Sequence, residues 1–198
     1  MIFRRYQMKE HISRVLIAAV LITTVFYFGC ILDPKPDKNP PGQPQADFKP
    51  LTEPENVIFN LVLSYERADF EHYSELLHDD YIWYNQDRYV NEGHEKFYTR
   101  EDDERMVHRM FMAVNGQWEP LIDNLSLSIK SGTWIANHDT INGEPCEDCW
   151  ETMRIYEINV TVGPKTYYGN DNIKFIVVPV MEDGIKKYKI FRAFDIAI

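Results

Sequence analysis

The feature that most limits how this chain can fold is a single change in hydrophobic period, which comes after Gly116. Before it, apolar side chains recur at helical spacing, as at Val57, Leu61 and Tyr65. After it, apolar and polar side chains alternate, as in the segment 125–130. Helices followed by consecutive strands predict an α+β fold, in which the helices pack on one face of an antiparallel sheet.

Three helix starts are visible in the first half of this domain. The segment 52–55 (Thr-Glu-Pro-Glu) has the pattern of a capping box with proline in the first turn. Asp69 can cap a short second helix, and Thr99 followed by acidic residues can cap a third, which ends at 115–116. The acids at 79–80 are interpreted as the cap of a turn after the second helix.

The strands are expected at residues 81–84, 125–129, 156–162, 173–180 and 188–195. The polar stretch 85–98 is expected to be a connection. In the last strand, alternation places Ile190 and Phe194 on one face and Phe191 and Ala193 on the other. A sheet with a second apolar face favours a homodimer.

Composition restricts the partners of the chain. Its 198 residues include 21 basic and 31 acidic side chains, a formal charge of −10. Nucleic-acid binding depends on a basic surface that neutralises phosphates, so we expect no nucleic-acid partner. We also expect no cofactor.

The N-terminus has the features of an export signal. Arg4, Arg5, Lys9 and Arg14 precede an uncharged apolar run of fourteen residues, 15–28. As a helix this run spans roughly 21 Å, which is short for a hydrocarbon core about 30 Å thick. The pattern therefore predicts a signal peptide, and an uncleaved membrane anchor is the alternative.

The residues Tyr27-Phe28-Gly29-Cys30 resemble the end of a bacterial lipoprotein signal, although the family usually has leucine in place of Tyr27. The resemblance implies that residues 1–29 are removed and that Cys30 carries acyl chains such as palmitate. It therefore implies a membrane partner and a lipid-anchored place in the bacterial cell envelope. Ile31, rather than aspartate, follows the cysteine and favours the outer membrane.

Residues 30–50 are interpreted as the lipidated cysteine and a proline-rich tether, followed by one domain at 51–198. The prolines are Pro34, Pro36, Pro40, Pro41, Pro44 and Pro50. Such density favours an extended polyproline-II spacer, which over twenty residues reaches roughly 60 Å. The alternative is a docking peptide for a proline-binding module.

Three segments of the domain resemble the NTF2-like (SnoaL-like) superfamily, namely 62–70, 73–83 and 188–195. The resemblance covers residues 51–198. It implies a cone in which three N-terminal helices pack on a curved antiparallel sheet. Members include ketosteroid-isomerase-like and cyclase-like enzymes, nonenzymatic binding modules and lipoproteins. The cone often holds a small hydrophobic ligand, and homodimers through the sheet are common.

An isomerase of this family needs a carboxylate base and hydrogen-bond donors at the developing oxyanion. Tyr65 stands where the family can place a donor tyrosine, and core packing is its other interpretation. The base position falls on Asn85, an amide that cannot act as a base, and Asp87 would need a different loop path. Tyr65 and Asp87 are therefore the catalytic candidates, and the missing base favours a nonenzymatic role.

The four histidines His72, His78, His94 and His108 are acid–bases by type but share no spacing, which favours surface or capping roles. Aromatic side chains are candidates to line an apolar ligand cavity, first among them Tyr65, Trp83, Tyr84, Trp118 and Tyr156, with Trp134 and Trp150 in addition. A filled interior is the alternative.

The pair Cys146-x-x-Cys149 allows several interpretations. In an exported protein we expect a disulfide. Zinc would need two further ligands, for which His138 with Asp139 or Asp148 are available. The surrounding acids would raise the thiol pKa and so disfavour a redox dithiol. A pair of free thiols is the remaining alternative. We expect no metal site.

Together these observations predict an envelope lipoprotein whose domain binds a small apolar ligand or a protein partner without catalysis. The alternative is a SnoaL-like isomerase, cyclase or hydratase that acts on a small hydrophobic carbonyl compound.

Overall fold

The computed structural model describes residues 46–138, 140–141 and 144–196. The expected signal peptide, Cys30 and most of the proline-rich segment lie outside the described residues. Within the described residues, no helix has both the length and the apolar character needed to cross a membrane.

The described helices are α2 (Pro54–Arg67), α3 (Phe70–Glu75), α4 (Asp87–Asn91) and α5 (Arg100–Val114). Asp69 caps α3 by accepting from His72 N at 3.1 Å. Thr99 and Asp102 form a reciprocal capping box at α5. The capping box expected at 52–55 is wrong, because the N-cap of α2 is Glu53, which makes no side-chain cap bond.

The strands are β1 (Leu77–Tyr84), β2 (Phe97–Thr99), β3 (Asn124–Ile129), β4 (Trp134–Asn137), β5 (Thr140–Ile141), β6 (Glu144–Pro145), β7 (Cys149–Val162), β8 (Lys165–Glu182) and β9 (Ile185–Ile196). The main sheet has the order β2-β1-β9-β8-β7-β3, and β4 also pairs with β7. β1 runs parallel to β9, whereas the other neighbours in this sheet are antiparallel. β5 and β6 form a separate two-stranded sheet.

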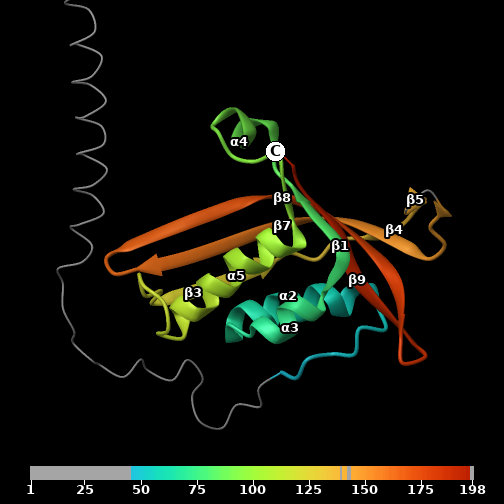
Figure 1. The fold of residues 1–198 in the computed structure, drawn as a ribbon, viewed down its shortest axis with the longest axis horizontal. Helices are drawn as coiled ribbons and strands as arrows, with labels where there is room; N and C mark the ends of the chain where they lie inside the picture. Colours follow the sequence, from blue (N-terminus) through green and yellow to red (C-terminus); the bar gives the residue numbers. More distant parts are fainter. Residues whose placement is uncertain (1–45, 139, 142–143, 197–198) are drawn as a thin grey trace, which may run out of the picture. The chain divides into compact units, whose positions relative to one another are not determined.

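Helices α2, α3 and α5 pack on the same face of the curved sheet (Figure 1), so the predicted α+β class with helices on one sheet face is confirmed. Their apolar stripes meet the inner face of the strands in one core, whose most buried side chains include Val57, Leu76, Phe111, Val177 and Ile190. α4 lies apart from these helices, beside the C-terminal end of β9 (Figure 1).

A bulge in β9 changes which side chains share a face. Ile176 pairs with Arg192 and Val177 pairs with Ile190, so Phe191 has no partner in the ladder. Ile190 and Ala193 consequently lie in the main core, while Phe191 lies in a second cluster on the outer face with Phe194 packed against it. The alternation expected for this strand is therefore wrong, because the extra residue inverts the pattern after Ile190.

The stretch between α3 and α5 also differs from expectation. β1 begins at Leu77, so the acids Asp79 and Asp80 lie within a strand rather than in a turn. The register between β1 and β9 shifts between Leu77 and Ile82, and Arg192 donates to the carbonyl of Asp80 across this irregularity. The stretch 85–98, expected as a connection, contains α4 and the start of β2.

Residues 46–50, expected at the end of the tether, are attached to the domain. The side chain of Asn60 is buried and forms two bonds with the backbone of Lys49, at 2.9 and 2.8 Å. The amide of Tyr188 donates to the carbonyl of Leu51 at 2.7 Å. The carbonyl of Ala46, the first residue that the structure describes, accepts from Arg67.

Candidate functional site

A cavity of about 110 Å³ lies between the helices and the inner face of the sheet. Its lining is mostly apolar and includes six aromatic side chains, Tyr65, Tyr73, Tyr81, Trp83, Tyr156 and Phe175. α2 and α3 contribute the first two rings, β1 the next two, and β7 and β8 the last two. One charged side chain, Asp103 from α5, is part of the lining.

Helix periodicity explains why a carboxylate faces this cavity. Asp103 lies four residues before Val107 and eight before Phe111, and both of these are buried in the core. Residues four apart lie on one helix face, so Asp103 continues the apolar stripe of α5 into the cavity. The acids Glu101 and Asp102 are more exposed.

Asp103 is 8% exposed and accepts a hydrogen bond from the phenol of Tyr73. Burial raises the pKa of Asp103 to about 6. Burial also raises the pKa values of Tyr73 and Tyr81 well above their usual range, and the nearby Asp103 carboxylate adds to both shifts. The phenols around this carboxylate therefore stay protonated at neutral pH and can act as hydrogen-bond donors.

Tyr65 and Trp83 present their rings to the cavity. The ring of Tyr65 meets Phe111 and Tyr73 edge-on, with centroids 5.1 and 5.9 Å apart. Burial is the main cause of the raised pKa of Tyr65, and Asp103 contributes. The indole NH of Trp83 donates to Asn85 Oδ1 at 3.1 Å, and Asn85 is not part of the cavity lining.

A buried polar cluster adjoins the cavity beyond Tyr156, which stands opposite Asp171 in the β7–β8 register. Gln86 donates to Asp171 at 2.8 Å and to Asp195 at 2.7 Å. Arg88 forms an ion pair with Asp171. Among the described residues, Gln86 Oε1 is buried without a hydrogen-bond partner. This cluster holds the start of α4 against β8 at Asp171 and against the C-terminal end of β9 at Asp195.

Burial raises the pKa of the Asp195 carboxyl, and the neighbouring Asp171 adds to the shift. Burial raises the pKa of Tyr156 as well, with Asp195 the largest charge contribution. Tyr156, one of the rings of the cavity lining, is therefore also close to the two carboxylates.

The aromatic side chains predicted as ligand contacts divide into two groups. Tyr65, Trp83 and Tyr156 line the cavity. Tyr84 instead stacks on Phe194 at 4.8 Å, because alternation along β1 turns it away from Trp83. Trp118 follows α5, is 46% exposed and has the Arg109 guanidinium 5.7 Å from its ring.

The other predicted aromatic and catalytic residues also lie outside the cavity lining. Trp134 donates to Glu55 at 2.8 Å, and Trp150 donates to Asp148 at 2.9 Å. Asp87 is exposed in the first turn of α4. Asn85 donates to the carbonyl of Glu95 at 2.6 Å. The carboxylate in the cavity is instead Asp103. It is not among the residues predicted from the sequence, although its place on the apolar stripe of α5 indicates that it faces the core.

The candidate histidines are likewise outside the lining. His72 lies 2.8 Å from the Asp69 carboxylate and stacks on Phe48. His78 points from β1 toward Phe191 on the outer face. His94 and His108 are exposed.

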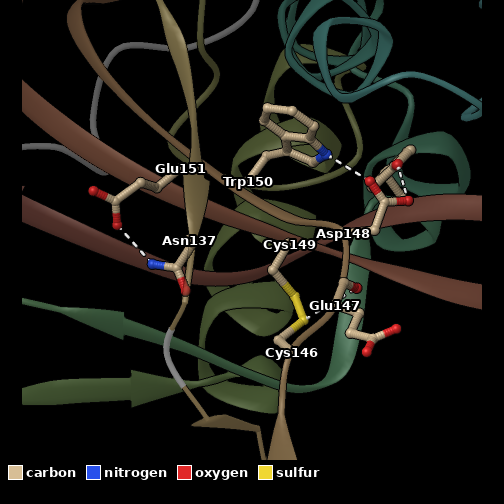
Figure 2. Close-up of a disulfide and its surroundings, with 8 residues drawn as sticks. Asn137, Cys146, Glu147, Asp148, Cys149, Trp150 and Glu151 are labelled. Atoms are coloured by element: carbon tan, nitrogen blue, oxygen red, sulfur yellow. Dashed lines mark hydrogen bonds between the residues drawn. A yellow bond between two sulfur atoms is a disulfide. The ribbon is translucent and has the colours of Figure 1, made fainter.

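Figure 2 shows a disulfide between Cys146 and Cys149, whose Cα atoms are 5.7 Å apart. Cys149 packs in the outer cluster, whereas Asp148 accepts bonds from Lys186 at 2.7 Å and Tyr188 at 2.6 Å. These bonds lower the pKa of Asp148 and fix the loop against β9. A bonded pair offers no thiolate to zinc.

The other zinc ligands considered do not form a site with this pair. His138 is exposed, and Asp139 lies outside the described residues. No cluster of metal-ligating side chains occurs in the part of the chain that the structure describes.

The sequence matches no family model and no curated protein. Among solved structures, the chain is similar to an NTF2-like protein of unknown function in nutrient uptake from Rhodospirillum rubrum. The two sequences are 14% identical, and the match covers 74% of this chain and 98% of that chain with a TM-score of 0.48. An NTF2-like protein from Cytophaga hutchinsonii has 17% identity, 73% and 94% coverage, and a TM-score of 0.45.

A third similar structure is an NTF2-like protein with a cystatin-like fold from Novosphingobium aromaticivorans, with 10% identity, coverage of 70% and 75%, and a TM-score of 0.47. At these identities and scores the similarity concerns the fold and carries over no function. The chain is an α+β protein similar in fold to NTF2-like proteins.

Proposed function

We propose that this protein is a lipid-anchored protein of the bacterial envelope whose domain binds a small, largely apolar molecule without catalysis. The observation that carries the binding proposal is the aromatic-lined cavity with a single carboxylate, Asp103. Ligand sites are typically apolar and aromatic with a few polar groups that fix orientation. This cavity has that composition.

The size of the cavity limits the ligand. A volume of about 110 Å³ is of the same order as the engineered cavity of about 150 Å³ that binds benzene. The ligand is therefore about the size of one substituted ring, or a larger molecule that inserts such a group.

The envelope setting is supported by the N-terminal sequence. A basic start, a short apolar run and Gly29-Cys30 favour export and acylation, and several acyl chains make an anchor stable. The proline-rich segment then separates an acidic domain from an anionic membrane surface.

The direct test is native mass spectrometry of the protein purified from its own membranes. An additional mass of a few hundred daltons or less that is retained on the protein and released on unfolding would support the proposal. Protein that never carries such a mass, and that binds no small aromatic probe in the same experiment, would contradict it.

A second candidate is proton-transfer catalysis, which the position of Asp103 favours. A carboxylate with a pKa near 6 beside the protonated phenols of Tyr73 and Tyr81 has the groups that enolisation requires. The test is deuterium exchange at the α-carbon of a small ring ketone in heavy water. Exchange above the buffer rate that Asp103→Asn removes would favour catalysis over binding alone.

A homodimer through the outer sheet face remains part of this proposal. That face carries the exposed side chains of Met153 and Ile155 on β7, beside the buried outer cluster of Cys149, Ile176, Val178 and Phe191. Light scattering on the intact protein measures the subunit count, and a monomer at all accessible concentrations would contradict the dimer.

A further inference from the structure

We infer that the cavity selects a small organic ammonium ion, with Asp103 as its counter-ion and the aromatic rings as its walls. This inference rests on the proposed binding function and specifies the ligand class. It depends on two features of the cavity that are independent of each other, one of charge and one of ring arrangement.

The charge argument is that the Asp103 carboxylate is buried and forms no ion pair with a described side chain. Its hydrogen-bond partner among the described residues is the neutral phenol of Tyr73, and no described lysine, arginine or histidine pairs with it. A buried charge is costly unless it is paired. A cationic ligand would supply the missing charge, whereas a neutral ligand would leave the carboxylate uncompensated.

The nearby arginines of α5 already have partners outside the cavity. Arg100 pairs with Asp79 at 2.5 Å and with Glu104 at 2.8 Å, and Arg105 pairs with Asp102 at 2.6 Å. The cations closest in sequence to Asp103 are thus held by other carboxylates. At neutral pH the cavity therefore carries a negative charge that no described cationic side chain pairs with.

The aromatic argument is that the rings surround the space next to this carboxylate. Six rings line the cavity, Tyr65, Tyr73, Tyr81, Trp83, Tyr156 and Phe175. Tyr73 directs its hydroxyl to Asp103, and Trp83 directs its NH to Asn85. Aromatic faces attract organic cations, and rings grouped around an ammonium group recognise it with high selectivity.

The same features predict an order of preference among ligands of equal shape. An ammonium ion gains both the ion pair with Asp103 and the attraction of the rings. A neutral alcohol can donate one hydrogen bond to the carboxylate but does not neutralise it. A carboxylate ligand is repelled by Asp103, the one charged side chain of the lining.

The test compares benzylammonium, benzyl alcohol and benzoate, which share one ring and differ in charge. The full chain is reconstituted in phosphatidylcholine nanodiscs, and calorimetry measures each dissociation constant against empty nanodiscs. Benzylammonium should bind at least about tenfold more tightly than benzyl alcohol, and benzoate should not bind.

Two variants separate Asp103 from general charge effects. Asp103→Asn keeps the shape of the side chain and should reduce the preference for ammonium over alcohol to within about twofold. Glu101→Gln removes an equal charge from an exposed position on the same helix and should leave the preference unchanged. Circular dichroism verifies that both variants are folded.

A pH series tests whether ammonium binding depends on the charge of Asp103 without a substitution. The groups that face Asp103 are Tyr65 from α2, Tyr73 from α3 and Tyr81 from β1, with Glu104 on its own helix. The pKa values of these three phenols are raised, so none of them ionises between pH 5 and 7. Since Asp103 protonates with a pKa of about 6, benzylammonium affinity should fall about tenfold from pH 7 to pH 5, while benzyl alcohol affinity stays constant.

The outcomes distinguish the two proposals. If benzyl alcohol binds as tightly as benzylammonium, or if the preference persists in Asp103→Asn, the ammonium inference is overturned and the binding function stands. If neither probe binds at any pH, the proposed binding function fails together with the inference.

Discussion

The phenol of Tyr73, on α3, donates a hydrogen bond to the carboxylate of Asp103, on α5, across thirty residues of chain. Both side chains are buried, and both line the cavity. The bond ties two helices together and holds a carboxylate inside a mostly apolar space. Buried titratable groups with shifted pKa values are concentrated at functional sites, and here such a group faces an open volume.

Tyr73→Phe should destabilise the fold at neutral pH, because the variant leaves the buried Asp103 carboxylate without its donor. The expected loss in the free energy of unfolding is about 1–3 kcal/mol. Urea unfolding at pH 7 measures it. Tyr168→Phe removes a hydroxyl from a residue that is 60% exposed and should change stability by less than about 0.5 kcal/mol. Equal effects of the two variants would contradict the role given to the Tyr73 hydroxyl.

The pH dependence of stability should carry a contribution from Asp103. Burial raises its pKa to about 6 in the folded chain, against about 3.9 in an unfolded chain. The folded chain therefore holds a proton that the unfolded chain releases between these values. The contribution of this group is fully present below about pH 4 and is lost as the pH rises through 6.

Asp103→Asn should abolish the fall in stability that this titration causes as the pH rises from about 4 to 6. Relative to the wild type, the free energy of unfolding of the variant should rise by about 2–3 kcal/mol between pH 4 and pH 7. Urea titrations at both pH values measure this difference, and Glu101→Gln should show no such gain. A difference between Asp103→Asn and the wild type that is constant over this range would show that the carboxylate does not titrate as inferred.

The disulfide should stabilise the domain modestly. Cys146 and Cys149 close a loop of only a few residues, for which chain entropy predicts about 2 kcal/mol. Cys146→Ser should lower the free energy of unfolding by this amount in oxidising buffer. In reducing buffer the variant and the wild type should be equally stable. A loss that persists under reduction would assign the effect to packing instead of to the covalent bond.

Cys30→Ser tests the proposed anchor. The variant should lose acylation, visible as the absence of incorporated labelled palmitate, and it should not mature by cleavage before residue 30. Cys146→Ser serves as the matched control and should remain acylated and membrane-bound. Wild-type protein that incorporates no acyl chain and keeps residues 1–29 would instead indicate an uncleaved anchor.

Local signals predicted the helix ends well where one side chain decides the geometry. Asp69 and Thr99 cap α3 and α5 as expected, because a short polar side chain before a helix satisfies free amides irrespective of tertiary structure. The strand at 125–129 is predictable for a different reason, because its alternation reflects one face packed on the core, whereas the same argument fails for β9. The proline at the start of α2 is predicted by the sequence, but the N-cap is Glu53, one residue later than expected.

Features that depend on tertiary contacts were not predictable. The bulge at Phe191 inverts the face pattern of β9, and no local property of this apolar residue marks it. α4 is held by Gln86, which reaches Asp171 and Asp195 more than eighty residues away. The sequence does not single out Asp103, because an acid in the first turn of a helix is normally explained by the helix dipole.

The measurement that tests the central claim most directly is methyl NMR of the protein labelled at isoleucine during a titration with benzylammonium and then benzyl alcohol. Ile129, Ile158, Ile173 and Ile190 line the cavity, whereas Ile135 and Ile185 are exposed on the surface. If the cavity is the binding site, the first four methyl signals shift and saturate with at least one probe while the two exposed signals stay in place. Shifts confined to Ile135 or Ile185, or no saturable shift with either probe, would contradict the account.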